Sequence, residues 1–299
     1  MLPTTLAALP FDLVDVFAEA PLAGNPLAVV RVETMPSAAL RQAFARETNL
    51  SETTFVATRP DADGHWPVRI HTPAVELPFA GHPTLGTAWV VAARLGGGTR
   101  VTLATGVGPV PVDLDGTGAG ALAWLDAPPV ERLEAPDDER IAAALALATA
   151  DLDGEVCVSA LADVGPRFVL VGLAARATLA GLVPDANRLT ALLSATGAVG
   201  LLAVAPAGPD EGDLSARMFF EAGGVREDPA TGSAACCLAA VLRAGGRLGR
   251  VELTQGVEML RPSRLRLELD GAGDRIGGRV FPVLTGELTR ELSATLAGA

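Results

Sequence analysis

Short runs of apolar or β-branched residues recur along most of the chain, and glycine, proline or aspartate bounds nearly every run. Such runs are typical of short β-strands. We therefore predict strands over residues 13–17, 27–32, 53–58, 68–72, 101–103, 122–125, 156–159, 168–171, 199–204, 217–220, 251–254 and 264–269.

Other stretches predict helices. Three of them, each entered through serine, proline or aspartate, cover residues 37–48, 136–148 and 184–194. The stretches 84–95 and 234–242 are also helical, but they are apolar nearly all round. Because a helix without a polar face must be buried on every side, we expect a small sheet to wrap around each of these two helices.

The two apolar helices follow related motifs. Residues 76–82 and 227–233 both read E-x-P-x-x-G followed by histidine or serine, about half a chain apart. A strand-like run that begins with arginine precedes each motif, at 69–72 and 217–220. A chance match is the alternative for so short a motif, but the shared context favours a duplicated domain. A turn-rich stretch near residues 126–129 indicates the domain boundary.

Composition excludes several classes of function. The chain has 299 residues, 49% of them apolar, so it can bury a core without disulfides or a structural metal. Its net charge of −12 repels phosphate backbones, and we expect no nucleic-acid partner. All 23 basic residues are arginine. The lack of lysine excludes Schiff-base and pyridoxal-phosphate chemistry and the P-loop lysine.

Cysteine usage and the chain start indicate a reduced, cytoplasmic protein. Cys157, Cys236 and Cys237 fit neither a zinc site nor a disulfide framework, so we expect no metal. The first residues lack the basic character of a secretory signal, and no apolar stretch reaches the ~20 residues of a membrane span. We therefore expect no membrane association.

The starts of the two apolar helices offer a place for an anion. Pro83 suits a first helical position, which makes His82 the expected N-cap. In the second motif either Asp228 is the cap before Pro229, or the helix starts later, at Ser233. In both cases backbone N–H groups without intrahelical partners and the positive end of the helix dipole face outward.

Glycine clears the approach to both helix starts. Gly81 and Gly232 carry no side chain that would block a ligand. Two such starts facing each other would bind an anion, most simply a carboxylate. The alternative is that both are merely capped helices.

Several polar residues near these starts are candidates for chemistry. Glu52 lies at a strand entrance between Asn49 and the predicted strand, where a buried carboxylate would suit a general base. The alternative is a solvated turn glutamate. Glu76 and Glu227 are expected to be structural, accepting hydrogen bonds from turn N–H groups. Two other histidines are expected outside the chemistry, His65 in a solvent-facing loop and His71 in the core or at its rim.

At this point the motifs resemble a known family. Asp-Val-Phe at 15–17 with Gly-Asn-Pro at 24–26, the run 49–56, the run 76–86 and the run 227–234 are similar, in this order, to the PhzF-like family of phenazine biosynthesis. The resemblance implies an α+β fold of the diaminopimelate epimerase type. Two similar domains, each a mostly antiparallel barrel-like sheet around a central buried helix, would hold the site between them. The implied domains are 1–126 with about 284–299, and 127–283.

The resemblance also implies a chemistry and roles. The family enzyme isomerises a dihydro-hydroxyanthranilate by moving a proton without a cofactor, and a homodimer is expected. Its catalytic glutamate matches Glu52, its glycine–histidine pair matches Gly81 and His82, and the second motif matches Asp228 and Ser233. Related epimerases and racemases use two thiols, one per domain. Residues 1–156 contain no cysteine, so that mechanism cannot operate here.

These observations predict a cofactor-independent isomerase for a small carboxylate. Glu52 would remove and return a proton, with His82 and Asp228 relaying it or positioning the substrate. The substrate-binding candidates are Gly81, Thr231, Gly232 and Ser233. The alternatives are a non-catalytic carboxylate-binding or regulatory protein that uses the same cleft, and a functional thiol at Cys236, which is otherwise packed as a small apolar group.

Overall fold

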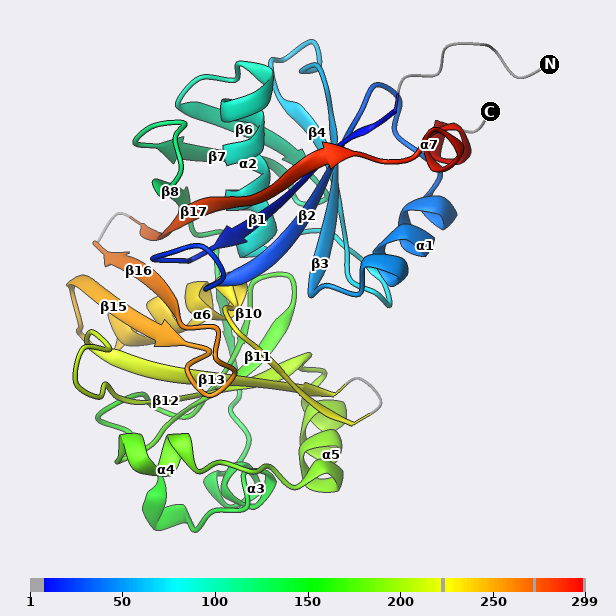
Figure 1. The fold of residues 1–299 in the computed structure, drawn as a ribbon. Coiled ribbons are helices and arrows are strands. Elements are labelled where there is room, and N and C mark those ends of the chain that lie inside the picture. The colour runs from blue at the N-terminus through cyan, green and yellow to red at the C-terminus, as the bar shows by residue number, and fades with distance from the viewer. Residues whose placement is uncertain (1–7, 222–223, 271–272, 298–299) are drawn as a thin grey trace. The chain divides into compact units, whose positions relative to one another are not determined.

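The computed structural model describes residues 8–221, 224–270 and 273–297, drawn as a ribbon in Figure 1. They form two compact units. Unit 1 runs to Leu125 and resumes at Gly278, and unit 2 is Asp126–Gly277. The strand at the second boundary, β17 (Asp274–Glu287), begins in unit 2 and ends in unit 1.

Unit 1 is built on a closed ring of eight strands. Besides the later part of β17, they are β1 (Pro10–Val16), β2 (Asn25–Val32), β3 (Glu52–Ala57), β4 (Trp66–His71), β6 (Arg100–Thr105), β7 (Gly108–Leu114) and β8 (Ala121–Asp126). Ladders join them in this order, and β17 pairs with both β8 and β1 to close the ring. The short strand β5 (Glu76–Leu77) forms a hairpin with β4.

Two pairs in this ring are parallel, and a helix connects the members of each. The helix α1 (Ala38–Thr48) joins β2 to β3, and α2 (Gly81–Leu95) lies between β4 and β6 in the chain. Parallel neighbours need such crossovers because a tight turn cannot return the chain to the same end of the sheet. The ladders β1–β17, β1–β2, β3–β4, β6–β7 and β7–β8 are antiparallel.

The helix α2 is the core of unit 1. Every residue from Gly81 to Ala92 is buried, as the absence of a polar face predicts. Gly86 permits the close approach, because a Cβ there would meet side-chain carbons of Leu27 and Val16 at 2.7 and 2.8 Å. The apolar pattern of this helix therefore results from its position inside the ring.

A second, smaller core packs α1 against the ring. Phe44 of α1 makes an edge-to-face contact with Phe55 of β3, with ring centroids 5.8 Å apart. The C-terminal helix α7 (Arg290–Ala297) adds Leu296 to this cluster and lies beside α1 in Figure 1. This packing fixes the end of α1, from which the chain enters β3.

Unit 2 repeats the plan. Its strands are β9 (Glu131–Leu133), β10 (Ala160–Asp163), β11 (Arg167–Gly172), β12 (Gly200–Pro206), β13 (Leu214–Glu221), β14 (Val225–Asp228), β15 (Gly249–Gln255), β16 (Ser263–Leu269) and the start of β17. Ladders join them in chain order, except that β14 forms a hairpin with β13 and β15 pairs directly with β13. The parallel pairs are β11–β12 and β13–β15.

Helices fill the inside and cover the outside of unit 2. The helix α6 (Gly232–Ala244) is buried from Gly232 to Leu242, as predicted. The others are α3 (Asp138–Ala144), the 3₁₀ turn η1 (Thr149–Asp151), α4 (Arg176–Ala180) and α5 (Ala186–Thr196). Leucines of α4 and α5 pack with β11 and β12 in one apolar cluster.

The register of the two hairpins confirms the predicted duplication. Glu76 pairs with His71 across β4 and β5, and Glu227 pairs with Phe219 across β13 and β14. In each case the strand partner lies two residues after the arginine that begins the run. The two sequence motifs therefore occupy the same place in two copies of one fold.

A glycine–proline contact repeats in the same way. A Cβ on Gly106 would lie 2.7 Å from the Cα of Pro78, and a Cβ on Gly256 would lie 2.7 Å from the carbonyl oxygen of Pro229. Each proline belongs to one motif, and each glycine follows the strand after the central helix. Only glycine leaves room for the motif turn at these two places.

Some predicted elements differ from the structure. Residues 156–159 form no strand, because the Cys157 N–H donates to the carbonyl of Asp153 in a turn, and the strand begins later, at Ala160. The helix predicted over 136–148 ends at Ala144, close to Ala146, which has a positive φ of 55°. Sequence patterns did not locate β5, β7, β9, β14 or the long β17.

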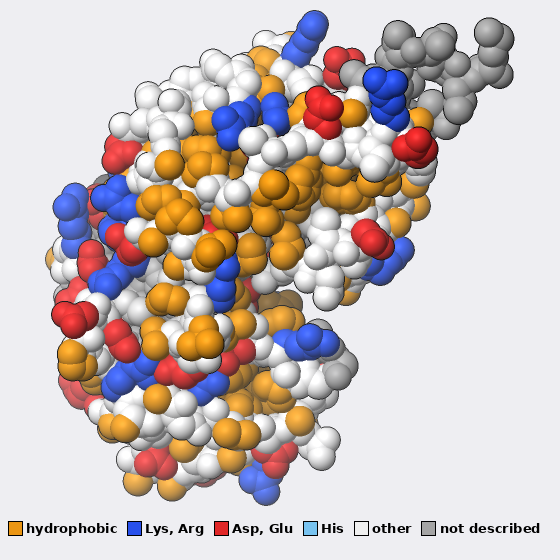
Figure 2. All heavy atoms as spheres, viewed as in Figure 1, with side chains coloured by type: hydrophobic (Ala, Val, Ile, Leu, Met, Phe, Trp, Pro, Cys, Tyr) orange, Lys and Arg blue, Asp and Glu red, His pale blue; other side chains and the backbone are white. Residues whose placement is uncertain are grey.

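The visible surface mixes charges. On the face drawn in Figure 2, arginines and acidic side chains are interspersed, with apolar side chains between them. Within the described ranges, no helix combines the length and the apolar character that crossing a membrane requires.

Candidate active site

Glu52 is the first residue of β3. The helix α1 ends at Thr48, its C-cap Asn49 adopts the left-handed conformation with φ 50°, and the chain then turns into the strand. The Glu52 side chain is only 15% exposed, so it is not a solvated turn residue. The packing of α1 against β3 thus holds this carboxylate at a strand entrance.

His82 faces Glu52 from the start of α2. The distance from His82 Nε2 to Glu52 Oε2 is 3.4 Å. The N-cap prediction was wrong: the helix begins at Gly81 with Ala80 as its N-cap. The reason is that the carbonyl of Ala80 already accepts the N–H and the hydroxyl of Thr84. His82 is therefore the second helical residue, and its imidazole points to the strand.

Burial keeps His82 neutral. Its side chain is 4% exposed, and removal from water lowers the pKa of His82 to about 3. On the other side of the imidazole, Asn25 Nδ2 lies 3.3 Å from His82 Nδ1. At neutral pH this group is an uncharged imidazole between an amide and a carboxylate.

No side chain caps the start of α2. Ala80 has no polar side chain, and the helix makes no side-chain cap hydrogen bond. Pro83 has no N–H, so Gly81 and His82 carry the N–H groups of the first turn that lack intrahelical acceptors. This helix start, beside Glu52, has the polarity that an anion needs.

In unit 2 the equivalent turn is held by hydrogen bonds. Asp228, at the end of β14, accepts the hydroxyl hydrogen of Thr231 at 2.6 Å. Gln255 accepts from the Thr231 N–H at 3.2 Å and donates to the Asp228 carbonyl at 2.7 Å. Sequence patterns gave no reason to choose Gln255, because it lies 24 residues from the turn that it braces.

The second helix start is also corrected. The helix α6 begins at Gly232 with Thr231 as its N-cap, so Asp228 is not the cap, and the later of the two predicted starts is off by one residue. The Thr231 hydroxyl bonds to Asp228 and does not cap the helix. Ser233, in the first turn, is 6% exposed.

Cys236 is packed inside α6. It is fully buried, and burial raises the pKa of its thiol to about 12. Cys237 is also buried, and burial raises its pKa too. Both thiols are therefore protonated at neutral pH and act as small apolar groups.

The motif glutamates bind arginines, not turn N–H groups as predicted. Glu76 accepts from Arg41 Nη2 at 3.0 Å and lies 3.6 Å from Arg69 Nε. Glu227 accepts from both Nε and Nη2 of Arg217, at 2.9 and 2.8 Å. Each pair braces the hairpin that leads into a buried helix.

Arg217 is the more completely bound of these arginines. Its Nη1 donates to the carbonyls of Leu179, Ala180 and Leu182, at the end of α4 and just beyond it. Its guanidinium lies over the ring of Phe219. Arg217 is recognisable in the sequence as the first residue of the strand-like run before the motif. Its role is not, because its partners are distant in the chain.

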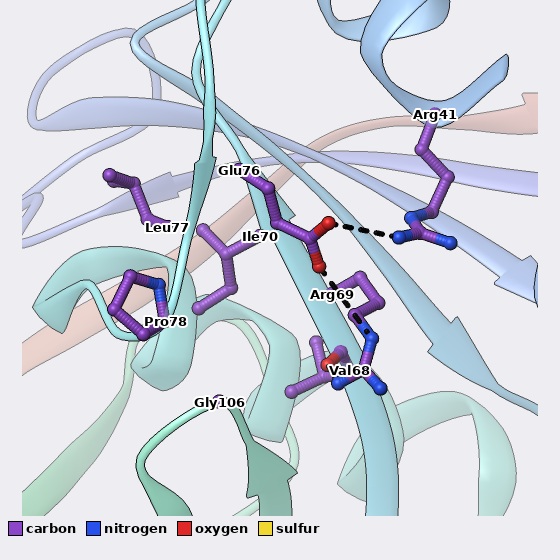
Figure 3. A pocket seen from close by; sticks show the side chains of 8 residues that line it. All are labelled: Arg41, Val68, Arg69, Ile70, Glu76, Leu77, Pro78 and Gly106. Atoms are coloured by element: carbon purple, nitrogen blue, oxygen red, sulfur yellow. Dashed lines mark hydrogen bonds and ion pairs between the residues drawn. The ribbon is translucent and has the colours of Figure 1, made fainter. Parts of the chain in front are cut away.

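A cavity of about 470 Å³ lies beside the unit 1 hairpin, lined by Arg41, Arg69, Glu76, Leu77 and Pro78 among others. Figure 3 shows the Glu76 carboxylate between the two guanidinium groups. Because Arg41 is also bonded to His71, these charges are used to hold the hairpin. Neither Glu52 nor His82 lines this cavity.

His71 lies in the core as predicted, and His65 lies in the predicted loop but is partly buried. His71 is buried, and its Nε2 accepts from Arg41 Nε at 3.0 Å. His65 lies in the loop after β3, where the Asp61 side chain accepts from the N–H groups of Asp63 and His65.

Comparison with known proteins identifies relatives over nearly the whole chain. The family model described as phenazine biosynthesis-like protein matches residues 14–283. The trans-2,3-dihydro-3-hydroxyanthranilate isomerase of Pseudomonas aeruginosa is 39% identical over 272 residues, which cover 89% of this chain and 92% of that protein.

Solved structures agree with this match. A predicted epimerase from Pseudomonas aeruginosa, 31% identical, has a TM-score of 0.82 and covers 94% of this chain and 99% of its own. A probable proline racemase from Agrobacterium radiobacter, 15% identical, has a TM-score of 0.65 and covers 97% and 98% of the two chains. The second likeness shows the fold alone. The expected α+β epimerase-type fold is therefore confirmed.

Proposed function

The chain belongs to the phenazine biosynthesis-like protein family, and from this membership we propose that Glu52 moves a proton on a small carboxylate substrate. The chain is a small-molecule isomerase, as its relatives are. The observation that carries the assignment is the 3.4 Å approach of the Glu52 carboxylate to a buried, neutral His82 at an uncapped helix start. A carboxylate so held is a general base that can take a proton and return it.

Each residue around Glu52 has a proposed task. His82, being neutral, acts as a hydrogen-bond partner and not as a cation. The N–H groups at Gly81 and His82 bind negative charge, either on the substrate carboxylate or on the enolate-like intermediate that forms when the proton leaves. We propose that the proton transfer needs no cofactor.

In unit 2 we propose that the turn from Asp228 to Ser233 binds the substrate. The N–H groups of Gly232 and Ser233 lie in the first turn of α6, and the Ser233 hydroxyl is close to them in sequence. Asp228 would orient a polar group of the substrate, with its own position fixed by Thr231. That this turn and Glu52 act on one substrate stays a prediction.

The relative's substrate supplies a probe. We propose trans-2,3-dihydro-3-hydroxyanthranilate as the first compound to test, because the relative that is 39% identical is named for it. The assay is incubation in D₂O after dialysis against a chelator, followed by mass spectrometry of substrate and product. The wild type is expected to form product and to incorporate deuterium.

The variant Glu52→Gln keeps the shape of the side chain and removes the base. We expect exchange and turnover to fall by about 10²–10⁴-fold. The matched control is Glu47→Gln, an exposed glutamate of α1, which should retain wild-type rates. Undiminished exchange in Glu52→Gln would remove Glu52 from the mechanism.

We also propose a homodimer in the cytoplasm, as the family resemblance implies. Cys157, Cys236 and Cys237 are free and buried, which suits a reducing compartment. Sedimentation equilibrium of the full chain tests the dimer, and a monomer at micromolar concentration would contradict it.

A further inference from the structure

We propose that Asn25 is a positioning residue that fixes the tautomer of His82, so that the ring nitrogen beside the Glu52 carboxylate, Nε2, carries the proton. This proposal rests on the proposed role of Glu52 as the base. It assigns a task to the Gly-Asn-Pro motif at 24–26, which the roles given above do not use.

The backbone delivers the Asn25 side chain to this place. Gly24 has a φ of +72°, and a Cβ there would lie 2.4 Å from the carbonyl oxygen of Val16, so only glycine fits the turn. The next residue, Asn25, opens β2 opposite Val16 in the β1–β2 ladder and is completely buried. The turn thus feeds an amide into the interior of unit 1.

The contact with His82 has a defined direction. Asn25 Nδ2 lies 3.3 Å from His82 Nδ1, and an amide nitrogen can donate a hydrogen bond but cannot accept one. Nδ1 must therefore carry the lone pair, and in a neutral imidazole the proton is then on Nε2.

The consequence falls on Glu52. His82 Nε2 lies 3.4 Å from Glu52 Oε2, and the two atoms do not form a hydrogen bond with each other in this structure. With this tautomer the ring nitrogen beside the carboxylate is the protonated one. With the other tautomer a nitrogen lone pair would face the same oxygen and repel it. The amide of Asn25 thus places a protonated nitrogen, and not a lone pair, beside the carboxylate, without itself contacting the substrate.

The first test reads the tautomer directly by ¹⁵N NMR of the full chain labelled on histidine. The chain has three histidines, and the His82→Gln variant identifies the His82 signals. At neutral pH the wild type should show a protonated Nε2 and an unprotonated Nδ1. A protonated Nδ1 would overturn the proposal, and this reading needs neither a substrate nor a folded Asn25 variant.

The second test reverses the contact. In Asn25→Asp, an almost isosteric change, a carboxylate accepts from Nδ1 and the two nitrogen signals should exchange. The turnover number should fall at least about tenfold with little change in KM, because a wrong tautomer costs a serine-protease triad about 10⁴-fold. The control is Asn187→Asp, on the exposed face of α5, which should match the wild type.

The outcomes separate this inference from the proposed function. Exchange of the two nitrogen signals in Asn25→Asp with an unchanged turnover number would overturn the positioning role. Asn25→Leu removes the donor, and a retained wild-type tautomer in that variant would also overturn it. A correct tautomer combined with a fully active Glu52→Gln would instead overturn the role of Glu52.

Discussion

The two units share one scaffold but differ in the chemistry that it carries. The ladder that pairs Thr53 with His71 in unit 1 pairs Leu201 with Phe219 in unit 2, so the equivalent of Glu52 is Gly200. A Cβ on Gly200 would lie 2.3 Å from the Met218 side chain, which fills the space.

The two motifs also differ at their last position, which is His82 in unit 1 and Ser233 in unit 2. The residues that the two units have kept in common are the arginine–glutamate hairpins, the glycine–proline contact and the buried helix. A duplicated fold can therefore keep its bracing in both copies while the acid–base pair remains in one.

The largest effect that we predict lies in unit 1. The Glu52→Asp variant keeps the carboxylate but shortens its side chain, which moves it away from the position beside His82. Because general acid–base catalysis contributes about 10²–10⁴-fold, we expect at least a hundredfold loss of turnover number. Steady-state kinetics measures it, and Glu47→Asp, at an exposed glutamate of α1, should leave the turnover number unchanged.

The next effect is on stability, and here we expect the larger loss in unit 2, because its arginine–glutamate pair is the more buried. Arg217 and Glu227 are 10% and 15% exposed, whereas Arg69 is 45% exposed. Removing one partner of a buried pair costs about 3–5 kcal/mol, so Arg217→Met should lower the free energy of unfolding by roughly that amount.

The matched variant in unit 1 is Arg69→Met. An exposed pair contributes about 1 kcal/mol or less, and Arg41 still binds Glu76 when Arg69 is lost. Urea unfolding measures both variants. Equal losses would contradict the account of unequal bracing.

A smaller effect is expected at the turn of unit 2. Gln255→Leu removes the side chain that binds Thr231 N–H and the Asp228 carbonyl, two groups in a partly buried turn. The cost of leaving such groups unsatisfied is about 1–3 kcal/mol. Thermal unfolding measures it, and KM should rise with the loss of order at the start of α6. A variant with unchanged KM would show that Gln255 does not position this turn.

The last effect is a pH dependence from His82. Its pKa is about 3 in the fold because of burial, against an ordinary value of 6.5. Between these values the unfolded chain binds a proton that the folded chain does not, so acidification from pH 6.5 downward lowers the free energy of unfolding. The slope is up to about 1.4 kcal/mol per pH unit.

Removing His82 should flatten this dependence. Unfolding of His82→Gln between pH 7 and pH 4 is expected to lose stability less steeply than the wild type. Part of the slope remains, since burial also lowers the pKa of His71. Identical pH slopes in His82→Gln and the wild type would mean that burial does not lower the pKa of His82 in the folded chain.

The sequence was informative where local pattern decides the structure. The apolar faces of 84–95 and 234–242 predicted buried helices, and the repeated motif predicted two copies of one fold, both of which the structure confirms. Glu52 was chosen through the family motif that it matches, whereas pattern alone favoured a solvated turn.

The contacts that were missed join residues far apart in the chain. Asn25 and His82 are 57 residues apart, and Arg217 reaches carbonyls 35–38 residues away. No local periodicity records such pairs. The N-cap of α2 was also predicted wrongly. The sequence predicted Pro83 as the first helical residue, but it is the third. Proline is tolerated throughout the first turn, because the N–H groups there have no intrahelical acceptor.

The claim that only unit 1 supplies the base is tested most directly by comparing Glu52→Gln with Ser233→Ala. Calorimetry measures Kd for each variant, and deuterium exchange is measured at saturating substrate. We expect Glu52→Gln to bind within about threefold of the wild type, the signature of an interaction used only in the transition state. Its exchange should be at least about a hundredfold slower. Ser233→Ala should bind more weakly and still exchange when saturated. The opposite pattern, with binding lost in Glu52→Gln and exchange lost in Ser233→Ala, would contradict the assignment of the base to unit 1.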